Sequence, residues 1–192
     1  LDPGLEDSSF VSTYILSPDG GWWVWPTTLT NFDHVADGDS IYVDTSAAFG
    51  TNELSVHEGN KALKMWGQFT GYENYTSIYQ QVGGINGLPA AVEEGQEMYV
   101  GAWAMSHSDG PLTGGTAFFV AINWLASDFS FIGQDQSVWL DSTYINENDL
   151  DWNEWHYMDV HGVAPAGVAH VQLQLTFYQP AGYAAGSVYV DA

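Results

Sequence analysis

The strongest constraint on the fold is a period-two pattern in residues 168–178. Apolar side chains occupy alternate positions there, with polar or tyrosine side chains between them: Val171, Leu173, Leu175 and Phe177 against Gln172, Gln174, Thr176 and Tyr178. Successive side chains of a β-strand point to opposite faces. We therefore expect a strand with one face in a core and the other facing solvent or a groove.

The rest of the chain has the spacing of turn residues that is typical of an all-β protein. Its 21 Gly and 7 Pro separate short runs rich in Val, Ile, Tyr, Phe and Trp, which is typical of an antiparallel β-sandwich or barrel. No segment has a sustained helical period with caps, and Asn146–Glu154 is expected to be a solvated loop. The other expected strands are Val11–Leu16, Ile41–Thr45, Lys61–Trp66, Thr76–Val82, Glu97–Met105, Thr116–Leu125, Ser137–Leu140, Glu154–His161 and Ser187–Asp191.

The charge balance excludes several classes of partner. The chain has 24 acidic residues against Lys61 and Lys64, and its net charge is -22. Such a surface repels phosphate backbones and anionic lipid headgroups, so we expect binding neither to nucleic acid nor to a membrane. Anionic glycans are disfavoured too, unless cations bridge the charges. Cys is absent, which excludes disulfides and thiolate metal sites.

Six segments, in order along nearly the whole chain, resemble motifs of one family. They are Asp2–Asp7, Val56–Lys64, Ile78–Val82, Glu94–Tyr99 with Ala102–Ala104, Asp151–Trp155 and Ser187–Asp191. Together they resemble the carbohydrate-binding modules of families 4, 9, 16 and 22. The chain departs from the family pattern at Leu5, where the family has Phe, in the segment Gly20–Thr51, and in its lack of Arg.

The resemblance implies a jelly-roll sandwich formed by residues 1–192 as a single domain. Such a module binds polysaccharide without cleaving it and is usually tethered to a secreted or cell-surface glycanase. The chain opens with Leu1-Asp2-Pro3-Gly4 and shows no basic signal-peptide start, so we expect a module excised from a larger protein. The excess of acidic residues suits an extracellular or salt-rich setting, and the module is expected to be a monomer tethered to other domains. The charge leaves a neutral β-glucan or xylan as the expected ligand.

The ligand candidates follow from the strand pattern and the resemblance together. In the resembling families the strand equivalent to 168–178 lines the concave face that holds the glycan, and an aromatic residue often stands at the rim. Trp66 joins the candidates because it alternates with Leu63 and Met65. The expected ligand residues are Tyr72, Tyr75, Trp66, Trp139, Gln172, Gln174, Thr176 and Tyr178. Trp22, Trp23 and Trp25 either form a further binding wall or cap the sandwich, and the structural interpretation is favoured.

The resemblance also implies a structural calcium ion. Its ligands would be Glu6, Asp191 and carbonyl groups of the Gly59–Lys61 turn, and calcium prefers oxygen ligands of these types. With 24 acidic residues, chance pairs of carboxylates are common, so only the family order favours this set. A zinc cluster is not expected, because His156 and His161 would point to opposite faces of their strand.

Three other functions stay open: a glycoside hydrolase, a lyase and a cell-surface adhesion domain. Asn146–Glu154 contains four carboxylates, and glycoside hydrolysis needs two, about 5–10 Å apart across a cleft. The carboxylate pattern that jelly-roll glucanases carry on one strand is absent, however, and a jelly-roll lyase usually needs Arg, Lys or His to neutralise a uronate. The third alternative, a cell-surface adhesion domain, would share the acidic β-sandwich but show no affinity for glycans.

Overall fold

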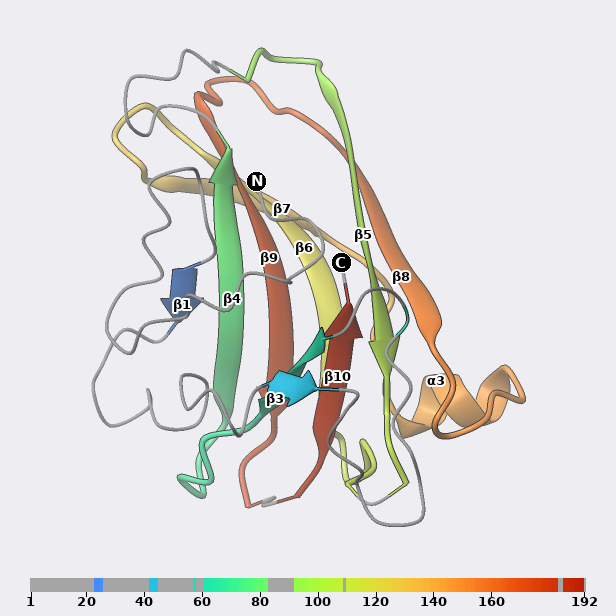
Figure 1. Cartoon of the computed structure of the whole chain (residues 1–192). Coiled ribbons are helices and arrows are strands. Elements are labelled where there is room, and N and C mark those ends of the chain that lie inside the picture. The colour runs from blue at the N-terminus through green and yellow to red at the C-terminus, as the bar shows by residue number, and fades with distance from the viewer. Residues whose placement is uncertain are drawn as a thin grey trace.

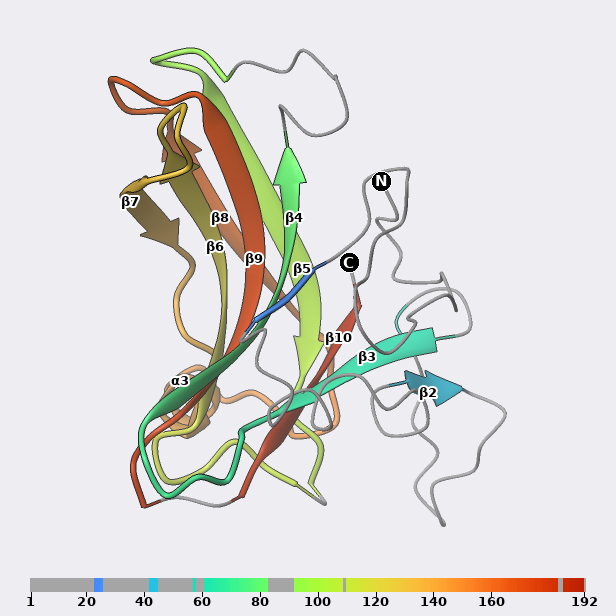
Figure 2. The same ribbon diagram turned by 90° about the vertical axis from the view of Figure 1, so that its left-hand side faces the viewer.

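The computed structural model describes residues 23–25, 42–44, 57, 61–82, 92–108, 110–182 and 185–191. Two antiparallel sheets form a sandwich (Figures 1 and 2). The elements are β1 (Trp23–Trp25), β2 (Tyr42–Asp44), β3 (Lys61–Trp66), β4 (Asn74–Val82), β5 (Glu97–Met105), β6 (Ala117–Leu125), β7 (Phe131–Gln136), α3 (Ser142–Glu147), β8 (His156–Val163), β9 (His170–Gln179) and β10 (Ser187–Asp191).

The strand order identifies the topology as a jelly roll. The first sheet has the order β1-β4-β9-β6-β7, and the second sheet has the order β2-β3-β10-β5-β8. From β3 onward the chain crosses between the sheets at every step except the β6–β7 hairpin. This double Greek-key path places β9 between β4 and β6, and β10 between β3 and β5. The predicted all-β jelly-roll sandwich is confirmed.

The core lies between the two sheets and is built from the inward-facing half of each strand. Its largest fully buried side chains include Leu63, Ile78, Phe118, Ile122 and Phe177, which come from both sheets. The strand β6 is buried along its whole length. Its inward side chains join the core, and its outward side chains are covered by groups of the first sheet's outer face. The strand β6 therefore contributes side chains both to the core and to the outer face of the first sheet.

A close contact shapes the edge where β7 and β8 meet. Trp124 Nε1 on β6 donates a hydrogen bond to Asp135 Oδ2 on β7 at 2.7 Å. A Cβ at Gly162 on β8 would lie 2.8 Å from the Trp124 ring and would also collide with the Asp135 carboxylate. The two sheets come together at this edge because Gly162 carries no side chain.

Most predicted strands match the observed ones closely. The ranges of β3, β5 and β10 are those expected, and β4, β6, β8 and β9 differ at their ends by a few residues. The predicted strand Val11–Leu16 lies outside the described residues.

Two local predictions are wrong. The strand expected at Ser137–Leu140 is instead β7, at Phe131–Gln136, and Leu140 only forms an isolated bridge with Phe118. The expected loop at Asn146–Glu154 begins inside helix α3. The Asp141 carboxylate caps this helix by accepting a 2.8 Å hydrogen bond from the backbone N–H of Tyr144, and Ile145 anchors it in the core.

Among the described residues, no helix has the length and apolar character that crossing a membrane requires.

Candidate functional site

The outer face of the first sheet carries the polar side chains of β9. Figures 1 and 2 show β9 bowed along its length, with its hollow side turned away from the second sheet. The register pairs Gln174 with Tyr79 on β4 and with Ala121 on β6. Residues directly opposite one another in an antiparallel pair share a face. Because the Ala121 side chain is a single methyl group, it rises little above the sheet at the centre of this face.

The neighbouring strands add more amide groups to this face. Gln172 pairs with Gln81 on β4 and with Asn123 on β6, and Asn123 pairs in turn with Gln134 on β7. Gln136, the last residue of β7, pairs with Ala121. We call this set the amide row; it consists of Asn123, Gln134, Gln136, Gln172 and Gln174.

A continuous chain of hydrogen bonds holds the amide row in place. Trp139 Nε1 donates to Gln136 Oε1 at 3.3 Å, and Gln136 Nε2 donates to Gln134 Oε1. Gln134 Nε2 donates to Asn123 Oδ1 at 2.6 Å. Asn123 Nδ2 then donates to Gln172 Oε1 at 2.8 Å and also to Gln174 Oε1.

The chain of hydrogen bonds ends in two buried hydroxyl groups. Gln174 Nε2 donates to Ser77 Oγ at 2.8 Å, and Ser77 Oγ lies 3.0 Å from Thr176 Oγ1. All the amide donors point in the same direction, from β7 toward β4, so each bond polarises the next. A primary amide has two N–H donors and two lone pairs on its oxygen. The row is therefore fixed in position and still has unused donors and acceptors for a ligand.

An aromatic wall stands at one end of the amide row. The Trp139 ring stacks on Phe119, with centroids 5.2 Å apart and planes 10° apart, and also meets Tyr178 at 5.2 Å. Tyr75 adjoins Tyr178 at 5.1 Å. Trp139 and Tyr75 are exposed despite these contacts. Rings that are packed on one side and exposed on the other provide flat contact area for a ligand.

Glu73 anchors the two tyrosines of this wall. Its carboxylate accepts hydrogen bonds from Tyr75 Oη at 3.4 Å and from Tyr178 Oη at 3.2 Å. Burial, and after it the negative charge of Glu73, raises the pKa of both tyrosine hydroxyls above its ordinary value. Both hydroxyls are therefore protonated at neutral pH.

A second aromatic pair lies at the opposite end of β9. The ring of His170 stacks on Phe129, with centroids 4.2 Å apart and planes 7° apart. His170 shares the outward side of β9 with Gln172 and Gln174 because it lies two and four residues before them. Along the strand, the amide row thus has aromatic side chains at both ends.

The structure brings six of the eight expected ligand residues together on this face. They are Tyr75, Trp139, Gln172, Gln174, Thr176 and Tyr178. Tyr72 lies nearby in the turn before β4 and is 78% exposed. Thr176 is only 1% exposed and bonds to Ser77, so it supports the face from beneath and does not reach a ligand.

Trp66 does not lie on this face. It is the last residue of β3 in the second sheet, where it is partly buried and packs against the main core. Alternation along β3 separates Trp66 from Leu63 and Met65, but it does not show to which sheet the strand belongs. The expected pairing of Trp66 with Tyr75 and Trp139 is therefore not observed.

Several residues of the site were not expected from the sequence. They are Ser77, Phe119, Asn123, Gln134, Gln136, Glu73, Phe129 and His170. Ser77, Phe119, Asn123, Gln134 and Gln136 lie on strands without clear alternation, and their place follows from the pairing register between strands far apart in the chain. Glu73 and Phe129 lie outside the strands. His170 begins β9, where the alternation that predicted Gln172 and Gln174 also assigns it to the outward side.

The backbone of two expected aromatic positions lies at the edge of the same sheet. The register of β1 pairs Trp23 with Tyr79 and Trp25 with Ser77. Trp22 lies outside the described residues.

The expected calcium ligands lie mostly beyond what the structure describes. Glu6 and Gly59 are outside the described residues, and Lys61 opens β3 opposite Asp44. Asp191 ends β10 opposite Trp103 and is buried. In the described ranges no group of three or more His, Asp or Glu side chains is arranged to hold a metal ion. A buried carboxylate is a ligand that calcium accepts, so Asp191 fits the expected set.

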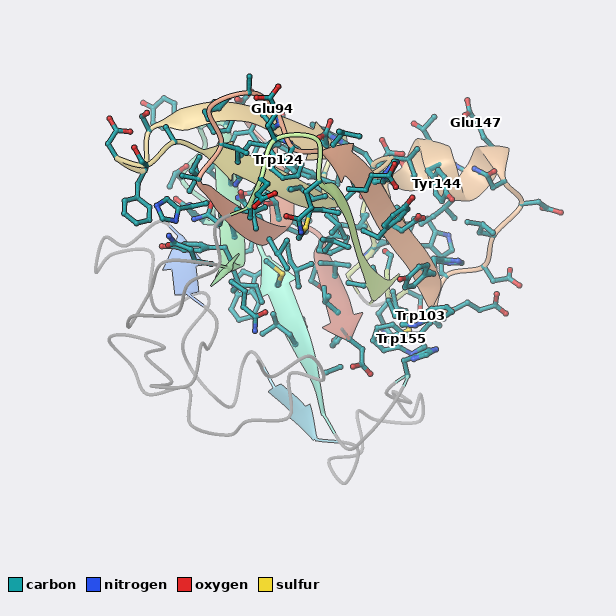
Figure 3. All side chains as sticks on the ribbon, turned by 90° about the horizontal axis from the view of Figure 1, so that it is seen from above. Glu94, Trp103, Trp124, Tyr144, Glu147 and Trp155 are labelled. Carbon is teal, nitrogen blue, oxygen red and sulfur yellow. The ribbon has the colours of Figure 1, made fainter. Side chains whose placement is uncertain are left out.

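The four carboxylates of Asn146–Glu154 lie outside the strands of both sheets. Glu147 belongs to α3, and Asp149, Asp151 and Glu154 follow in the connection to β8; all four are exposed. Figure 3 shows Glu147 projecting from α3, away from the sandwich. This arrangement does not place any of them beside the amide row.

Comparison with known proteins gives fold similarity only. No protein-family model matches the chain, and no curated protein matches it. Among solved structures, the chain is similar to TmCBM61 in complex with β-1,4-galactotriose, with 13% identity, a TM-score of 0.48, and coverage of 99% of this chain and 91% of that one. It is also similar to a CBM4 structure, with 12% identity, a TM-score of 0.47, and coverage of 100% and 94%.

A third similar structure contains the CBM22-1 and GH10 modules of Clostridium thermocellum endo-1,4-β-D-xylanase 10B with xylohexaose. Its identity is 13% and its TM-score 0.43, and the match covers 79% of this chain and 23% of that one. These similarities are low, and the function of the amide row is inferred from its own geometry.

Proposed function

We propose that the outer face of the first sheet binds a neutral polysaccharide and that the chain is a non-catalytic carbohydrate-binding module. The observation that carries this proposal is the hydrogen-bonded amide row, which has the Trp139 wall on one side along β9 and the His170–Phe129 pair on the other. Sugars present hydroxyl groups that both donate and accept hydrogen bonds, and their C–H faces cover aromatic rings. The amide row and the Trp139 wall supply these two kinds of contact side by side.

The direction of the row suggests how the glycan lies. The amides run across β7, β6 and β9 toward β4, which is roughly 14 Å at the usual strand spacing. A polysaccharide crossing the strands would lie over two parallel lines of side chains, Gln136 with Gln174 and Gln134 with Gln172. Trp139 then stacks against one flank of the chain, while the buried Asn123, Ser77 and Thr176 hold the amides in register.

The charge of the chain supports a neutral ligand. With a net charge of -22 and only two lysines, the protein repels sulfated and uronic chains. We propose a β-glucan or a xylan as the ligand class. Because neither lysine belongs to the amide row, binding is expected to depend little on salt concentration.

Affinity electrophoresis in gels containing laminarin, xylan or a soluble cellulose derivative tests the proposal. The wild type should be retarded by at least one of them and should release no reducing ends from it. Trp139→Ala and Gln174→Ala should each weaken binding, Trp139→Ala by about tenfold or more because aromatic anchors commonly carry the most energy. Val138→Ala and Gln96→Ala are matched controls, since both residues are exposed and lie outside the amide row.

The results that contradict the proposal are distinct. Wild-type binding by both site variants would mean that the site is elsewhere. Release of reducing ends would make the chain an enzyme. Calcium-dependent binding of a sulfated or uronic glycan alone would overturn the ligand class, and failure to bind any glycan would favour an adhesion or structural domain.

We further propose that the module works as a monomer outside the cell, within a larger glycan-degrading protein, and that a calcium ion stabilises it. The motif resemblance supports the tethering and the calcium, and the excess of acidic residues suits an extracellular setting.

A further inference from the structure

The outer face of the second sheet carries its own row of aromatic rings. On β5 and β8, the rings of Tyr99 and His161 stack with centroids 4.2 Å apart, and Trp103 and Tyr157 meet at 5.2 Å. His57 stacks on Trp103 at 3.9 Å and extends the row. Figure 3 shows Trp103 and Trp155 close together beside β8. We call Tyr99, His161, Tyr157 and Trp103 the tyrosine row.

Two rings of this row are strongly exposed. Tyr99 is 70% exposed and Tyr157 is 54% exposed, and they lie on β5 and near the start of the edge strand β8. Large aromatic side chains at such positions are normally covered. Since the two sheets pack through their inner faces, the tyrosine row and the amide row face away from each other.

A glycine fixes the orientation of Tyr157. A Cβ added at Gly101 would collide with Oη and Cζ of Tyr157, so the ring lies directly over the bare backbone of β5. The ring is thereby held against the sheet between Tyr99 and Trp103, the alternate positions on either side of Gly101. A ring whose hydroxyl end lies over the sheet and whose side chain is 54% exposed provides contact area for stacking.

The charges beside the row limit what can cover it. Glu97 accepts a hydrogen bond from Tyr99 Oη at 3.3 Å, and Asp159, opposite Gly101, is exposed on the same face. Lys64 lies over the ring of Tyr189 on β10, and Lys61 is at the start of β3. A second copy of this chain would bring another 22 net negative charges to an acidic face.

We propose that the tyrosine row is a second binding surface for a neutral carbohydrate chain, so that one molecule holds two chains on opposite faces. The C–H face of a sugar covers the Tyr157 and Tyr99 rings, and its hydroxyls donate to the Glu97 and Asp159 carboxylates. This inference takes its ligand class from the proposed function of the amide row. The two surfaces share no residue, so experiment can disprove binding at one of them without disproving binding at the other.

The test begins from a variant without the first surface, Trp139→Ala with Gln174→Ala. Its binding to cellohexaose, xylohexaose and laminarihexaose is measured by calorimetry. This variant should still bind one of them at one site per molecule, where the wild type shows two. Adding Tyr157→Ala should then weaken the remaining binding about tenfold or more, and Tyr157→Phe should keep it because the ring remains.

Gly101→Ala is the sharpest variant, because it leaves every aromatic residue in place and only lifts the Tyr157 ring. It should weaken binding as Tyr157→Ala does. Gly133→Ala on β7 is the matched control, since a Cβ there meets nothing within 4 Å. Thermal melting of all variants verifies that they fold. Because the clash is with the end of a side chain, Gly101→Ala can relax by moving that ring.

Three outcomes overturn the proposal. They are the loss of all binding in the variant without the first surface, unchanged binding after both Tyr157→Ala and Gly101→Ala, and a dimer in sedimentation that Tyr157→Ala dissolves. If the Trp139 and Gln174 variants bind like the wild type while the Tyr157 variants do not, the amide row fails and the tyrosine row stands. With long polysaccharide, only a protein with both surfaces should form turbid cross-linked complexes.

Discussion

At the scale of single residues, Asn123 connects the two halves of the amide row. It accepts from Gln134 and donates to Gln172 and Gln174, and it is 6% exposed. Asn123→Ala would leave three amide groups without their partner. We expect the free energy of unfolding to fall by about 1–3 kcal/mol, because unsatisfied polar groups in a poorly hydrated site are costly.

Urea denaturation measures this change, and Asn146→Ala, at an exposed position of α3, is the control. The variant should also lose affinity for the glycan that the wild type binds. Unchanged stability and affinity would show that water replaces the missing partner and that Asn123 does not position the row.

Glu73 contributes to the raised pKa of the two tyrosines in the aromatic wall. Burial is the largest cause of the raised pKa of Tyr75 and Tyr178, and the Glu73 carboxylate adds to it by charge and by hydrogen bonding. Glu73→Gln removes the charge, so the pKa of both hydroxyls should fall toward its ordinary value of about 10. NMR titration of the tyrosine Cζ resonances measures the two values in the wild type and in the variant.

The sign of the stability effect follows from this shift. A hydroxyl whose pKa is higher in the folded chain stabilises the fold fully below the unfolded pKa, near 10. That stability is lost as the pH rises through the folded pKa. The Glu73→Gln variant should therefore lose less stability than the wild type in this alkaline window. A rise of either pKa in the variant would contradict the role given to Glu73.

At the scale of elements, sequence reasoning succeeded where apolar residues alternate or run together and failed at an edge strand that buries little. The strand β9 could be predicted because Val171, Leu173, Leu175 and Phe177 all face the core. The strand β7 could not, because it pairs with β6 alone among the described strands and Phe131 and Ile132 are exposed. An edge strand at the rim of a sandwich buries too little to leave a pattern.

The same limit applies to the candidate site. The outward side of β9 predicted Gln172, Gln174 and Tyr178 because alternation assigns faces within one strand. It could not identify Asn123 or Gln134, which lie opposite Gln172 and Asn123 only because of the register between strands. Nor could it show that Trp66 belongs to the second sheet, since alternation does not define the partner of a strand.

Helix α3 depends on its cap more than on its length. It has six residues, and Asp141 satisfies the N–H of Tyr144. Asp141→Ala should cost about 1 kcal/mol. Amide exchange at Tyr144 and Ile145 should become faster in the variant, and Thr143→Ala, at an exposed helical position, should leave it unchanged. Equal protection in both variants would show that the packing of Ile145 is sufficient.

At the scale of the whole molecule, the proposed calcium ion is expected to tie both ends of the chain to the sandwich. A ligand that binds only the folded state at a hundredfold excess over its dissociation constant stabilises it by about 2.7 kcal/mol. Melting should therefore occur at a higher temperature with calcium than with a chelator. Glu6→Gln and Asp191→Asn should each reduce the difference, and magnesium should not replace calcium.

The same melting temperature under all these conditions, with no metal found by elemental analysis, would exclude the ion.

The jelly-roll order has a consequence for how the chain acquires its shape. The last strand, β10, lies between β3 and β5, where Tyr189 pairs with Lys64 on one side and with Met105 on the other. The second sheet therefore stays divided until Ser187–Asp191 has emerged from the ribosome. Pairings between such distant parts of a sequence make folding slow, in milliseconds to seconds. A nascent chain stalled before Ser187 would expose two unpaired strand edges and be a ready substrate for chaperones.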